Sequence, residues 1–347
     1  MEVIHLTHKT ETVLVTGGTG FVAGWAIHEL LIQGYKVRTT VRSKEKEQAV
    51  IDSLSGQGYQ RDHLTFYTAD LSSDEGWEAA VSGVDYVLHI ASPLTSGNHN
   101  DLDSFVKPAR DGALRVLRAA VWAGVQRVVM TSSLAAATPD LSSTDQHINE
   151  SLWTDPADKN LNAYRKSKAI AEKAAWNFIN EQNSQTTLTT ILPGAIFGPV
   201  LSAHVPSSIE VIQRLVQGKS PGNPKISFEV VDVRDLVELH IQAMTSPEAA
   251  GQRYIASGGS IWMNDIAKLL KNELGPGGRN IPTKTIPDIV LRGAAKITPS
   301  LAALVPMLGR KFRYTSEKAR GQLGWRPRPI EDTILDTAKR LEELKLL

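Results

Sequence analysis

The stretch that most constrains the fold of this chain is residues 12–24, where a short apolar run passes through a glycine-rich turn into a helical pattern. Val13 to Val15 predict a buried strand, and the apolar residues spaced from Phe21 to Ile32 predict a helix. Gly17 permits a tight turn between them, and Gly20 lets backbone N–H groups approach a pyrophosphate at the positive end of the helix. The stretch is therefore predicted to be a phosphate-binding strand–turn–helix unit.

The third small position of this turn is Ala23 rather than glycine. Alanine still allows close packing of the helix on the strand, although Gly24 offers the same role one residue later. The competing interpretation is a tight turn that binds no ligand. If the turn does hold a pyrophosphate, we expect the contacts to come from Gly17, Thr19, Gly20, Phe21 and Val22.

Short β-branched runs alternate with longer helical patterns up to about residue 200, which is typical of a parallel sheet covered by helices on both faces. This pattern predicts an α/β fold with a Rossmann-type, doubly wound parallel sheet, whose ligand crevice lies at the carboxyl ends of the strands. The candidate strands are Thr12–Thr16, Lys36–Thr40, Leu64–Thr68, Tyr86–Ile90, Arg127–Thr131 and Thr187–Leu192.

The pattern loosens after about Phe197, where prolines interrupt short helical runs. We expect residues 1–196 to form the nucleotide-binding domain and residues 197–347 to form mainly a smaller mixed α/β lobe that binds substrate. A further strand pattern, Ile226–Val231, precedes a helix that begins near Asp232. Residues from about 226 to 245 are therefore expected to return to the first domain, so the boundary is not clean.

The composition excludes several classes of protein. The 347 residues include 38 basic and 37 acidic side chains, so no strong field attracts nucleic acid or a membrane surface. The absence of cysteine excludes disulfides, cysteine nucleophiles and thiolate metal sites, and the nine histidines show no metal-ligand spacing, so we expect no metal. The first twelve residues lack a signal-peptide core, and no run approaches the about 20 apolar residues of a membrane span. A cytoplasmic protein is expected.

Tyr164 and Lys168 lie one turn apart on one face of a predicted helix, Tyr164 to Asn180. A phenol is normally a weak acid, with a reference pKa of about 10, and an ammonium ~4 Å away stabilises a phenolate by up to ~4 kcal/mol. Tyr164 is therefore a candidate general acid. The competing interpretation is an ordinary surface pair at this helical spacing.

Hydroxyl side chains follow the fifth predicted strand. Residues 131–133 are Thr, Ser and Ser, and a hydroxyl at the end of that strand can donate to a carbonyl oxygen on which charge develops. The competing interpretation is an ordinary cap on the next segment. Ser133 is selected as the catalytic hydroxyl on the family pattern described below.

The residues after the second and third strands predict the identity of a dinucleotide. An enzyme that prefers NAD typically has an acid after the second strand to hold the ribose, but this chain has Arg42 and, four residues later, Lys46, which suit a 2′-phosphate. Asp70 and Leu71 follow the third strand, where the carboxylate can accept from the adenine amino group; a helix cap is the competing interpretation. The sequence favours NADPH over NADH.

The segment after the fourth strand is expected to pass beneath the ribose and nicotinamide of the same cofactor. It contains Ala91, Ser92 and Pro93, whereas His89 is expected to be a packed strand residue.

Taken together, these motifs resemble the extended (atypical) short-chain dehydrogenase/reductases. The branch is similar to dihydroflavonol 4-reductase, cinnamoyl-CoA reductase and the microbial NADPH-dependent aldehyde and ketone reductases. The resemblance covers nearly the whole chain. It extends over residues 16–23, Arg42, Asp70 and Leu71, residues 89–93, residues 131–133, Tyr164 and Lys168, residues 192–199, residues 232–235 and residues 323–325.

The resemblance implies a role for several side chains. Ser133 and Tyr164 would bind the carbonyl oxygen, and Tyr164 would donate the proton. Lys168 would hold the nicotinamide ribose and make Tyr164 a better donor. Pro193 and Ile196 would pack near the nicotinamide and keep its reactive face toward the substrate. The activity implied is an NADPH-dependent carbonyl reductase that converts an aldehyde or ketone to an alcohol.

Two features distinguish this chain from other enzymes of the resembling family. Sugar-nucleotide dehydratases place an acid beside the catalytic hydroxyl, but Leu134 follows Ser133 here, and the acid that holds NAD in the epimerases is missing after the second strand. The substrate wall is expected to be apolar and suited to aromatic or aliphatic carbonyls, although its members could instead pack the two lobes together. Its candidates are Leu94, Leu134, Trp153, Phe197 and Val205.

Other functions on the same fold stay open at this point. They are a hydroxysteroid dehydrogenase, a sugar-nucleotide epimerase, and a regulator that senses NADP without chemistry. Such regulators commonly lose the tyrosine or the lysine, and this chain keeps both. A small carbonyl compound is the expected partner, with the chain acting as a monomer or homodimer.

Overall fold

The computed structural model describes residues 9–55, 61–93, 102–140, 147–298, 301 and 304–347. Within these residues the largest sheet has seven strands in the order β10-β7-β5-β4-β1-β2-β3, and every neighbouring pair is parallel. Its strands are β1 (Thr12–Val15), β2 (Lys36–Val41), β3 (Leu64–Thr68), β4 (Tyr86–His89), β5 (Arg127–Thr131), β7 (Thr187–Pro193) and β10 (Arg253–Ala256). The predicted doubly wound parallel sheet is confirmed.

The six predicted strands are all present, with bounds that match or differ by one residue at the carboxyl end. The seventh strand, β10, was not predicted. It has four residues and lies at the edge of the sheet beside β7, in a part of the chain where the alternation of strands and helices is already interrupted. Tertiary pairing with β7, rather than a local pattern, makes it a strand.

The centre of the sheet is buried on both sides, and β1 shows this most clearly. Val13 and Val15 belong to the apolar cluster on one face, and Leu14 belongs to the cluster on the other. All three side chains are fully buried. Successive side chains of a strand point to opposite faces, so a strand covered by helices on both sides must be apolar throughout.

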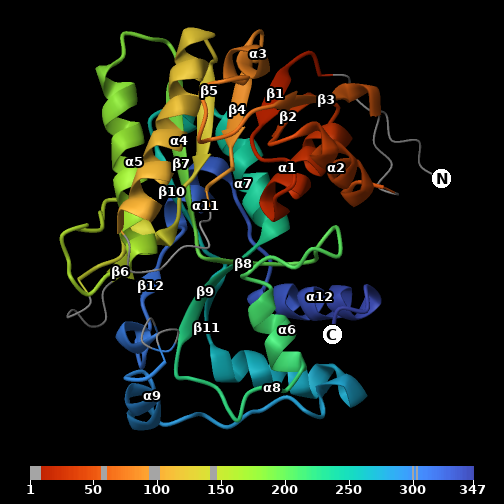
Figure 1. Ribbon diagram of the computed structural model, residues 1–347, viewed down its shortest axis with the longest axis vertical. Coiled ribbons are helices and arrows are strands. Elements are labelled where there is room, and N and C mark those ends of the chain that lie inside the picture. The colour runs from red at the N-terminus through yellow and green to blue at the C-terminus, as the bar shows by residue number, and fades with distance from the viewer. Residues whose placement is uncertain (1–8, 56–60, 94–101, 141–146, 299–300, 302–303) are drawn as a thin grey trace.

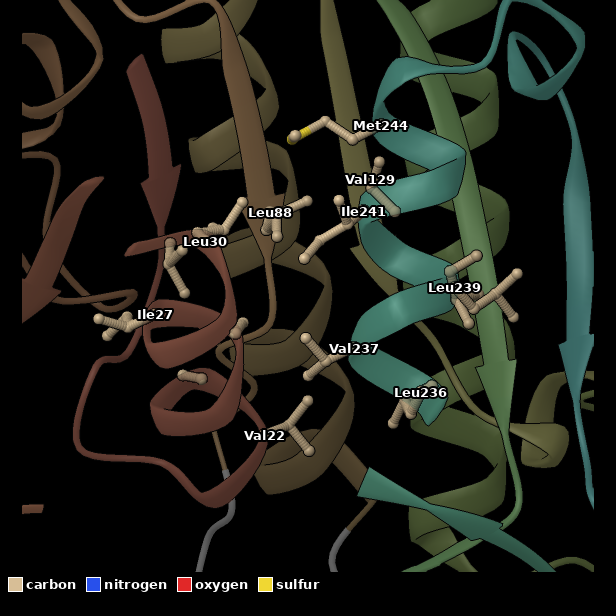
Figure 2. Packing of buried hydrophobic residues seen from close by; sticks show 14 of the residues in the cluster. Val22, Ile27, Leu30, Leu88, Val129, Leu236, Val237, Leu239, Ile241 and Met244 are labelled. Atoms are coloured by element: carbon tan, nitrogen blue, oxygen red, sulfur yellow. The ribbon is translucent and has the colours of Figure 1, made fainter. Parts of the chain in front are cut away.

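Helices α1 (Phe21–Ile32) and α7 (Val233–Thr245) cover one face of the sheet, and Figure 2 shows their apolar side chains meeting Leu88 and Val129 of the strands. The other face is covered by α3 (Trp77–Val81), α4 (Leu102–Trp122) and α5 (Ala163–Glu181). The bounds predicted for α1 are confirmed, and α5 extends one residue beyond its prediction at each end. Short α2 (Glu47–Ser53) and α11 (Glu317–Leu323) lie on the α1 side.

A second lobe lies beyond the carboxyl ends of the large sheet (Figure 1). Its three-stranded mixed sheet has the order β11-β9-β8, formed by β8 (Ala195–Phe197), β9 (Ser227–Asp232) and β11 (Gly259–Trp262). Helices α6 (Glu210–Val216), α8 (Met263–Glu273) and α12 (Ile330–Glu343) enclose its core. The predicted strand at 226–231 is β9 and belongs to this small sheet, whereas α7 and β10 return to the large one.

The remaining elements are short. Strands β6 (His147–Ile148) and β12 (Arg313–Tyr314) pair with each other, and α9 (Asp288–Ala294) lies in the second lobe. The 3-10 turns are η1 (Lys44–Lys46), η2 (Arg61–His63), η3 (Leu134–Ala137), η4 (Pro247–Ala249), η5 (Gly275–Gly278) and η6 (Val305–Met307). No helix in the described part of the chain is both long enough and apolar enough to cross a membrane.

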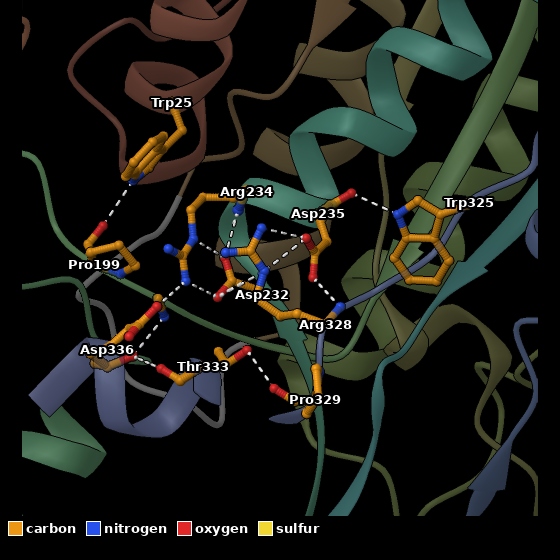
Figure 3. A network of polar contacts seen from close by, with 12 residues as sticks. Trp25, Pro199, Asp232, Arg234, Asp235, Trp325, Arg328, Pro329, Thr333 and Asp336 are labelled. Atoms are coloured by element: carbon orange, nitrogen blue, oxygen red, sulfur yellow. Dashed lines mark hydrogen bonds and ion pairs between the residues drawn. The ribbon is translucent and has the colours of Figure 1, made fainter. Parts of the chain in front are cut away.

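A network of charged side chains joins the two lobes where β9 leads into α7 (Figure 3). The Asp232 carboxylate is fully buried, caps α7 by accepting from the Arg234 backbone N–H at 2.8 Å, and pairs with the Arg234 guanidinium at 2.8 Å. Arg234 also reaches Asp336 of α12 at 2.7 Å, and Arg328 pairs with Asp235. Because α12 encloses the core of the second lobe and α7 covers the large sheet, these ion pairs connect the two lobes.

We expect Asp232→Asn to lower the free energy of unfolding by about 2–3 kcal/mol, because asparagine keeps the helix cap but leaves the partly buried Arg234 with one carboxylate fewer. Urea unfolding followed by circular dichroism measures this change. The matched control is Asp265→Asn, which breaks an exposed pair with Lys268 at 3.1 Å and should change stability by less than ~0.5 kcal/mol. Equal losses in the two variants would show that burial of the Asp232 pair contributes nothing.

Candidate active site

The predicted phosphate-binding turn is tightly constrained around β1 and α1. Gly17 has φ +74°, and its N–H donates to Thr40 Oγ1 at 2.9 Å, while the Gly18 N–H donates to the Thr40 carbonyl at 3.0 Å. A Cβ on Gly17 would lie 2.9 Å from Ala91 Cβ, and one on Gly18 would lie 2.4 Å from Thr39 Oγ1. The turn is therefore pressed against the ends of β2 and β4 and has no room for side chains.

The first turn of α1 presents backbone donors rather than a side-chain cap. Gly20 is the capping residue, no side chain accepts from the helix N–H groups there, and the first turn contains no acid. Thr19 and Gly20 are exposed, Phe21 is half-buried and Val22 is buried. Ala23 is almost fully buried against the sheet, so the third small position serves helix packing. Free N–H groups at the positive end of a helix suit an anion.

Thr16 ties the end of β1 to the end of β4. Its Oγ1 accepts from the backbone N–H groups of Ile90 at 3.1 Å and Ala91 at 3.0 Å, so its own proton is donated to His89 Nδ1, which lies 3.1 Å away. His89 is therefore the neutral tautomer protonated on Nε2. Burial lowers the pKa of His89 to about 3, and the nearby Lys168 ammonium acts in the same direction. As expected from the sequence, His89 is a packed strand residue.

Cationic and acidic side chains follow the carboxyl ends of the neighbouring strands β2 and β3. Arg42 is exposed directly after β2, and Lys46 is exposed in η1. The Asp70 carboxylate accepts from the Ser72 hydroxyl at 2.6 Å and the Ser72 N–H at 2.7 Å, which holds the pKa of Asp70 below its usual value with a smaller contribution from Arg42. Asp70 thus forms a local turn with Ser72 and does not cap a helix, since α3 begins only at Trp77 with Gly76 as its cap, and Asp70 lies within electrostatic reach of Arg42. Leu71 packs against Gly112 of α4.

Ser133 ends the loop after β5 and begins η3. Its backbone is extended, and its Oγ accepts from the Ala135 N–H at 3.1 Å. An oxygen that accepts at this point keeps its own proton for another acceptor. The side chain is half-buried, and η3 packs directly against α5. Ser133 therefore lies at the start of a turn that packs against the helix that carries Tyr164, and its hydroxyl proton is free to be donated.

Tyr164 lies in the first turn of α5 and Lys168 lies one turn later. Asn162 caps this helix by accepting from the Arg165 N–H at 2.9 Å, so the start of α5 is fixed two residues before Tyr164. The Tyr164 side chain is 38% exposed. Lys168 Nζ donates to Ser92 Oγ at 2.9 Å, so the structure brings together the lysine and the segment after β4.

A cavity of about 20 Å³ lies beside Lys168, between the ends of β4 and β5 and helices α4 and α5. Its polar lining includes His89, Ser92, Ser132 and Lys168. Ala91 and Pro93 also line it. A space of this size accepts one water molecule.

The segment after β7 turns sharply past the second lobe. Pro193 is buried as the last residue of β7, and Ile196 is half-buried in β8. A Cβ on Gly194 would lie 2.2 Å from the Glu229 carbonyl, so only glycine lets the chain lie this close to β9, with which β8 then pairs in parallel. Pro193 and Ile196 lie on either side of this close approach along the chain.

The expected substrate wall is only partly assembled by the fold. Leu134 is 7% exposed, and Trp153 is 37% exposed with the Arg253 guanidinium 3.6 Å from its ring centroid. Val205 is half-buried against the core of the second lobe. Phe197 is fully buried in that core, so it packs the lobe and presents no surface to a ligand in this structure. Leu94 lies outside the described residues.

A buried acid, Glu172, and its partner Arg253 were not predicted from the sequence. Glu172 is four residues after Lys168, so helical spacing alone would have placed it on the face that carries Tyr164 and Lys168. It accepts from Arg253 Nε at 2.8 Å. Thr16 and Thr40, which hold the glycine turn, were also missed, because a hydroxyl at a strand end carries no distinctive pattern. The described residues contain no group of three side chains able to hold a metal ion.

A family model and several curated proteins match this chain over most of its length. The sequence model of the NAD dependent epimerase/dehydratase family matches residues 13–256. Anthocyanidin reductase ((2S)-flavan-3-ol-forming) of Vitis vinifera is 34% identical over 275 residues, which cover 75% of this chain and 80% of that protein. Cinnamoyl-CoA reductase 1 of Petunia hybrida is 30% identical over 337 residues, covering 96% and 92%.

Among solved structures, yeast methylglyoxal/isovaleraldehyde reductase Gre2 complexed with NADPH superimposes with a TM-score of 0.81. It is 26% identical, and the match covers 97% of this chain and 100% of that one.

The buried His89 predicts how stability depends on pH. Its folded pKa of about 3 lies below the ordinary value of 6.5, so the unfolded chain binds a proton that the native protein does not. This contribution to stability is complete above pH 6.5 and is lost as the pH falls toward 3, at about 1.4 kcal/mol per pH unit.

We therefore expect His89→Gln to make the acid limb of the stability curve shallower, measured by urea unfolding at successive pH values. Thr189→Val is the matched control, because it removes a buried hydroxyl that donates to the Ala249 carbonyl at 2.6 Å and contains no titrating group. It should lower stability without changing the slope. An unchanged slope in the His89 variant contradicts the assignment.

Proposed function

The chain belongs to the NAD dependent epimerase/dehydratase family, and from that premise we propose that it is an NADPH-dependent reductase of aldehydes or ketones. The proposal is carried by the arrangement of three residues: Tyr164 and Lys168 share a face of α5, and Ser133 caps η3, which packs against that helix. The alcohol product is chiral where the substrate is an unsymmetrical ketone.

The residues present fit a dinucleotide phosphate. Gly17 and Gly18 let the turn lie close against Ala91 and Thr39, and α1 offers backbone donors with no side-chain cap. We propose that this turn holds the pyrophosphate, that Arg42 and Lys46 bind the 2′-phosphate, and that Asp70 and Leu71 border the adenine. Bound NADPH would supply the hydride that reduces the carbonyl carbon.

In this proposal Ser133 donates a hydrogen bond to the carbonyl oxygen of the substrate, and Tyr164 donates the proton that becomes the hydroxyl hydrogen of the product. Lys168 stabilises the negative charge left on the Tyr164 oxygen, since the two side chains lie one helical turn apart. Ser92 orients Lys168 through the contact at 2.9 Å. Hydrogen-bond donors that are already in position need no reorganisation energy when negative charge develops on the carbonyl oxygen.

The proposed substrates are aromatic or aliphatic carbonyl compounds without a charged group near the reacting carbon. Trp153, which is 37% exposed, would supply apolar surface for such a substrate, and the residue after Ser133 is not an acid. The relatives named above are reductases, which favours reduction over epimerisation.

We expect Tyr164→Phe to lower kcat by about 10²–10⁴-fold, because the variant lacks the proton donor, while NADPH binding stays nearly unchanged. The loss of NADPH absorbance with a panel of aryl ketones, aldehydes and β-keto esters measures turnover, and NADPH fluorescence measures binding. Tyr86→Phe is the matched control, since Tyr86 begins β4 and therefore lies at the amino ends of the parallel strands, away from the carboxyl ends where the site lies. Full activity in Tyr164→Phe would exclude the mechanism. NADPH binding without turnover of any panel compound by the unaltered protein would favour a sensor.

We expect Arg42→Ala to raise the KM for NADPH by about 10-fold or more and to change the KM for NADH little, because a charge-assisted bond to the 2′-phosphate is lost. Steady-state kinetics with both cofactors test this. Lys44→Ala is the matched control, an exposed cation two residues away in η1. An equal effect of Arg42→Ala on both cofactors would refute the assignment of the 2′-phosphate.

A further inference from the structure

The side chain of Glu172 is fully buried in the middle of α5 and has four hydrogen-bond partners. Three lie on different strands or strand ends, and the fourth, Trp176, lies on α5 itself and donates at 3.4 Å. Its carboxylate accepts from Ser132 Oγ at 2.5 Å, from Thr190 Oγ1 at 2.8 Å and from Arg253 Nε at 2.8 Å. A buried carboxylate is costly unless it is paired and hydrogen-bonded, so this complete set of donors accounts for its presence in the core.

Glu172 fixes the rotation of the helix that carries Tyr164. Tyr164, Lys168 and Glu172 are spaced by four residues, so they follow one another along one face of α5. The helix rises ~12 Å from Tyr164 to Glu172 and is stiff over that length. A rotation of α5 about its axis would carry the Glu172 carboxylate away from its donors and move Tyr164 by a similar amount.

The apolar packing of α5 differs along its length. Trp176, Phe178 and Ile179 pack against the core near its carboxyl end. In the half that carries Tyr164 the other buried side chains are small, namely Ala163, Ser167, Ala169 and Ala171. Small side chains let a helix approach closely but interlock weakly with the surface below, whereas one buried polar contact can specify a register. The carboxylate of Glu172 therefore supplies the specificity that the alanine face lacks.

Ser132 connects this carboxylate to the other half of the site. It is buried, its N–H donates to the Ile191 carbonyl at 2.7 Å, and its hydroxyl donates to Glu172. The next residue is Ser133. The bond between Ser132 and Glu172 thus joins the segment that carries the proposed hydroxyl donor to the helix that carries the proposed proton donor.

We propose that Glu172 is a positioning residue, which acts through Ser132 to set where Tyr164 lies relative to Ser133. This inference rests on the proposed function for its effect on catalysis. Arg253 supports the unit: it also donates to the carbonyls of Glu150 at 2.5 Å and Leu152 at 2.9 Å, and its guanidinium covers Trp153. Changes of Glu172 or Arg253 would disturb all these contacts together, so Ser132 is the sharper site to alter.

The experiment compares Ser132→Ala with Thr190→Val. Each variant removes one hydrogen bond from a buried neutral hydroxyl to the same carboxylate, and Ser132 directly follows β5 whereas Thr190 lies in β7. Only Ser132 is joined to Ser133. We expect Ser132→Ala to lower kcat by about 10–100-fold with the KM for NADPH unchanged, since small misplacement of reacting groups has effects of this size. Thr190→Val should keep kcat within about twofold, and both variants should lose a similar amount of thermal stability.

Equal losses of kcat in the two variants, or none in Ser132→Ala, would overturn the positioning role. A second measurement does not depend on turnover: crystal structures of the two variants and the unaltered protein give the separation of Ser133 Oγ and Tyr164 Oη. A changed separation in Ser132→Ala alone supports the proposal, and an unchanged one refutes it. If the unaltered protein reduces no carbonyl compound, the proposed function fails while the crystal structures still decide the positioning.

Discussion

Burial of the central strand β1 on both faces is the constraint on which the rest of the structure depends. Its three apolar residues can be removed from water only if helices cover both sides of the sheet. The neighbours of β1 are β2 and β4, so the chain order reverses on either side of it. The loops from the carboxyl ends of β1, β2 and β4 therefore diverge and leave a crevice, and the glycine turn begins at that point.

Hydroxyl and carboxylate side chains then fix the loops that the sheet only brings near one another. Thr16 joins β1 to β4, Thr40 holds the glycine turn against β2, and Glu172 joins α5 to β5, β7 and β10. Each of these groups is buried or nearly so and has its partners in place. A polar network in which every group has a hydrogen-bond partner makes its surroundings rigid. A site that depends on donors held in fixed positions requires this rigidity.

The fold could be predicted from sequence because periodicity is a local property. The runs at 36–40 and 127–131 alternate with helical patterns, and the turn after Val15 has the glycines that a phosphate site needs. The edge strand β10 could not be predicted in the same way, since four residues form a strand only by pairing with β7. Phe197 shows the same limit for the site: its apolar side chain suits a substrate wall or a core, and only packing decides that it lies in the core.

The sequence by itself determined the doubly wound sheet, the glycine turn, the basic residues after β2 and the spacing that places Tyr164 and Lys168 on one helix face. Each of these features depends on residues that are close together along the chain, so the local sequence pattern is sufficient to predict it. Only the tertiary structure decided that Ser92 contacts Lys168, that His89 is neutral beside Thr16, and that Glu172 is paired with Arg253. The partners in these contacts are between 73 and 81 residues apart along the chain, and their pairing follows from the crossing of buried elements rather than from any local signal.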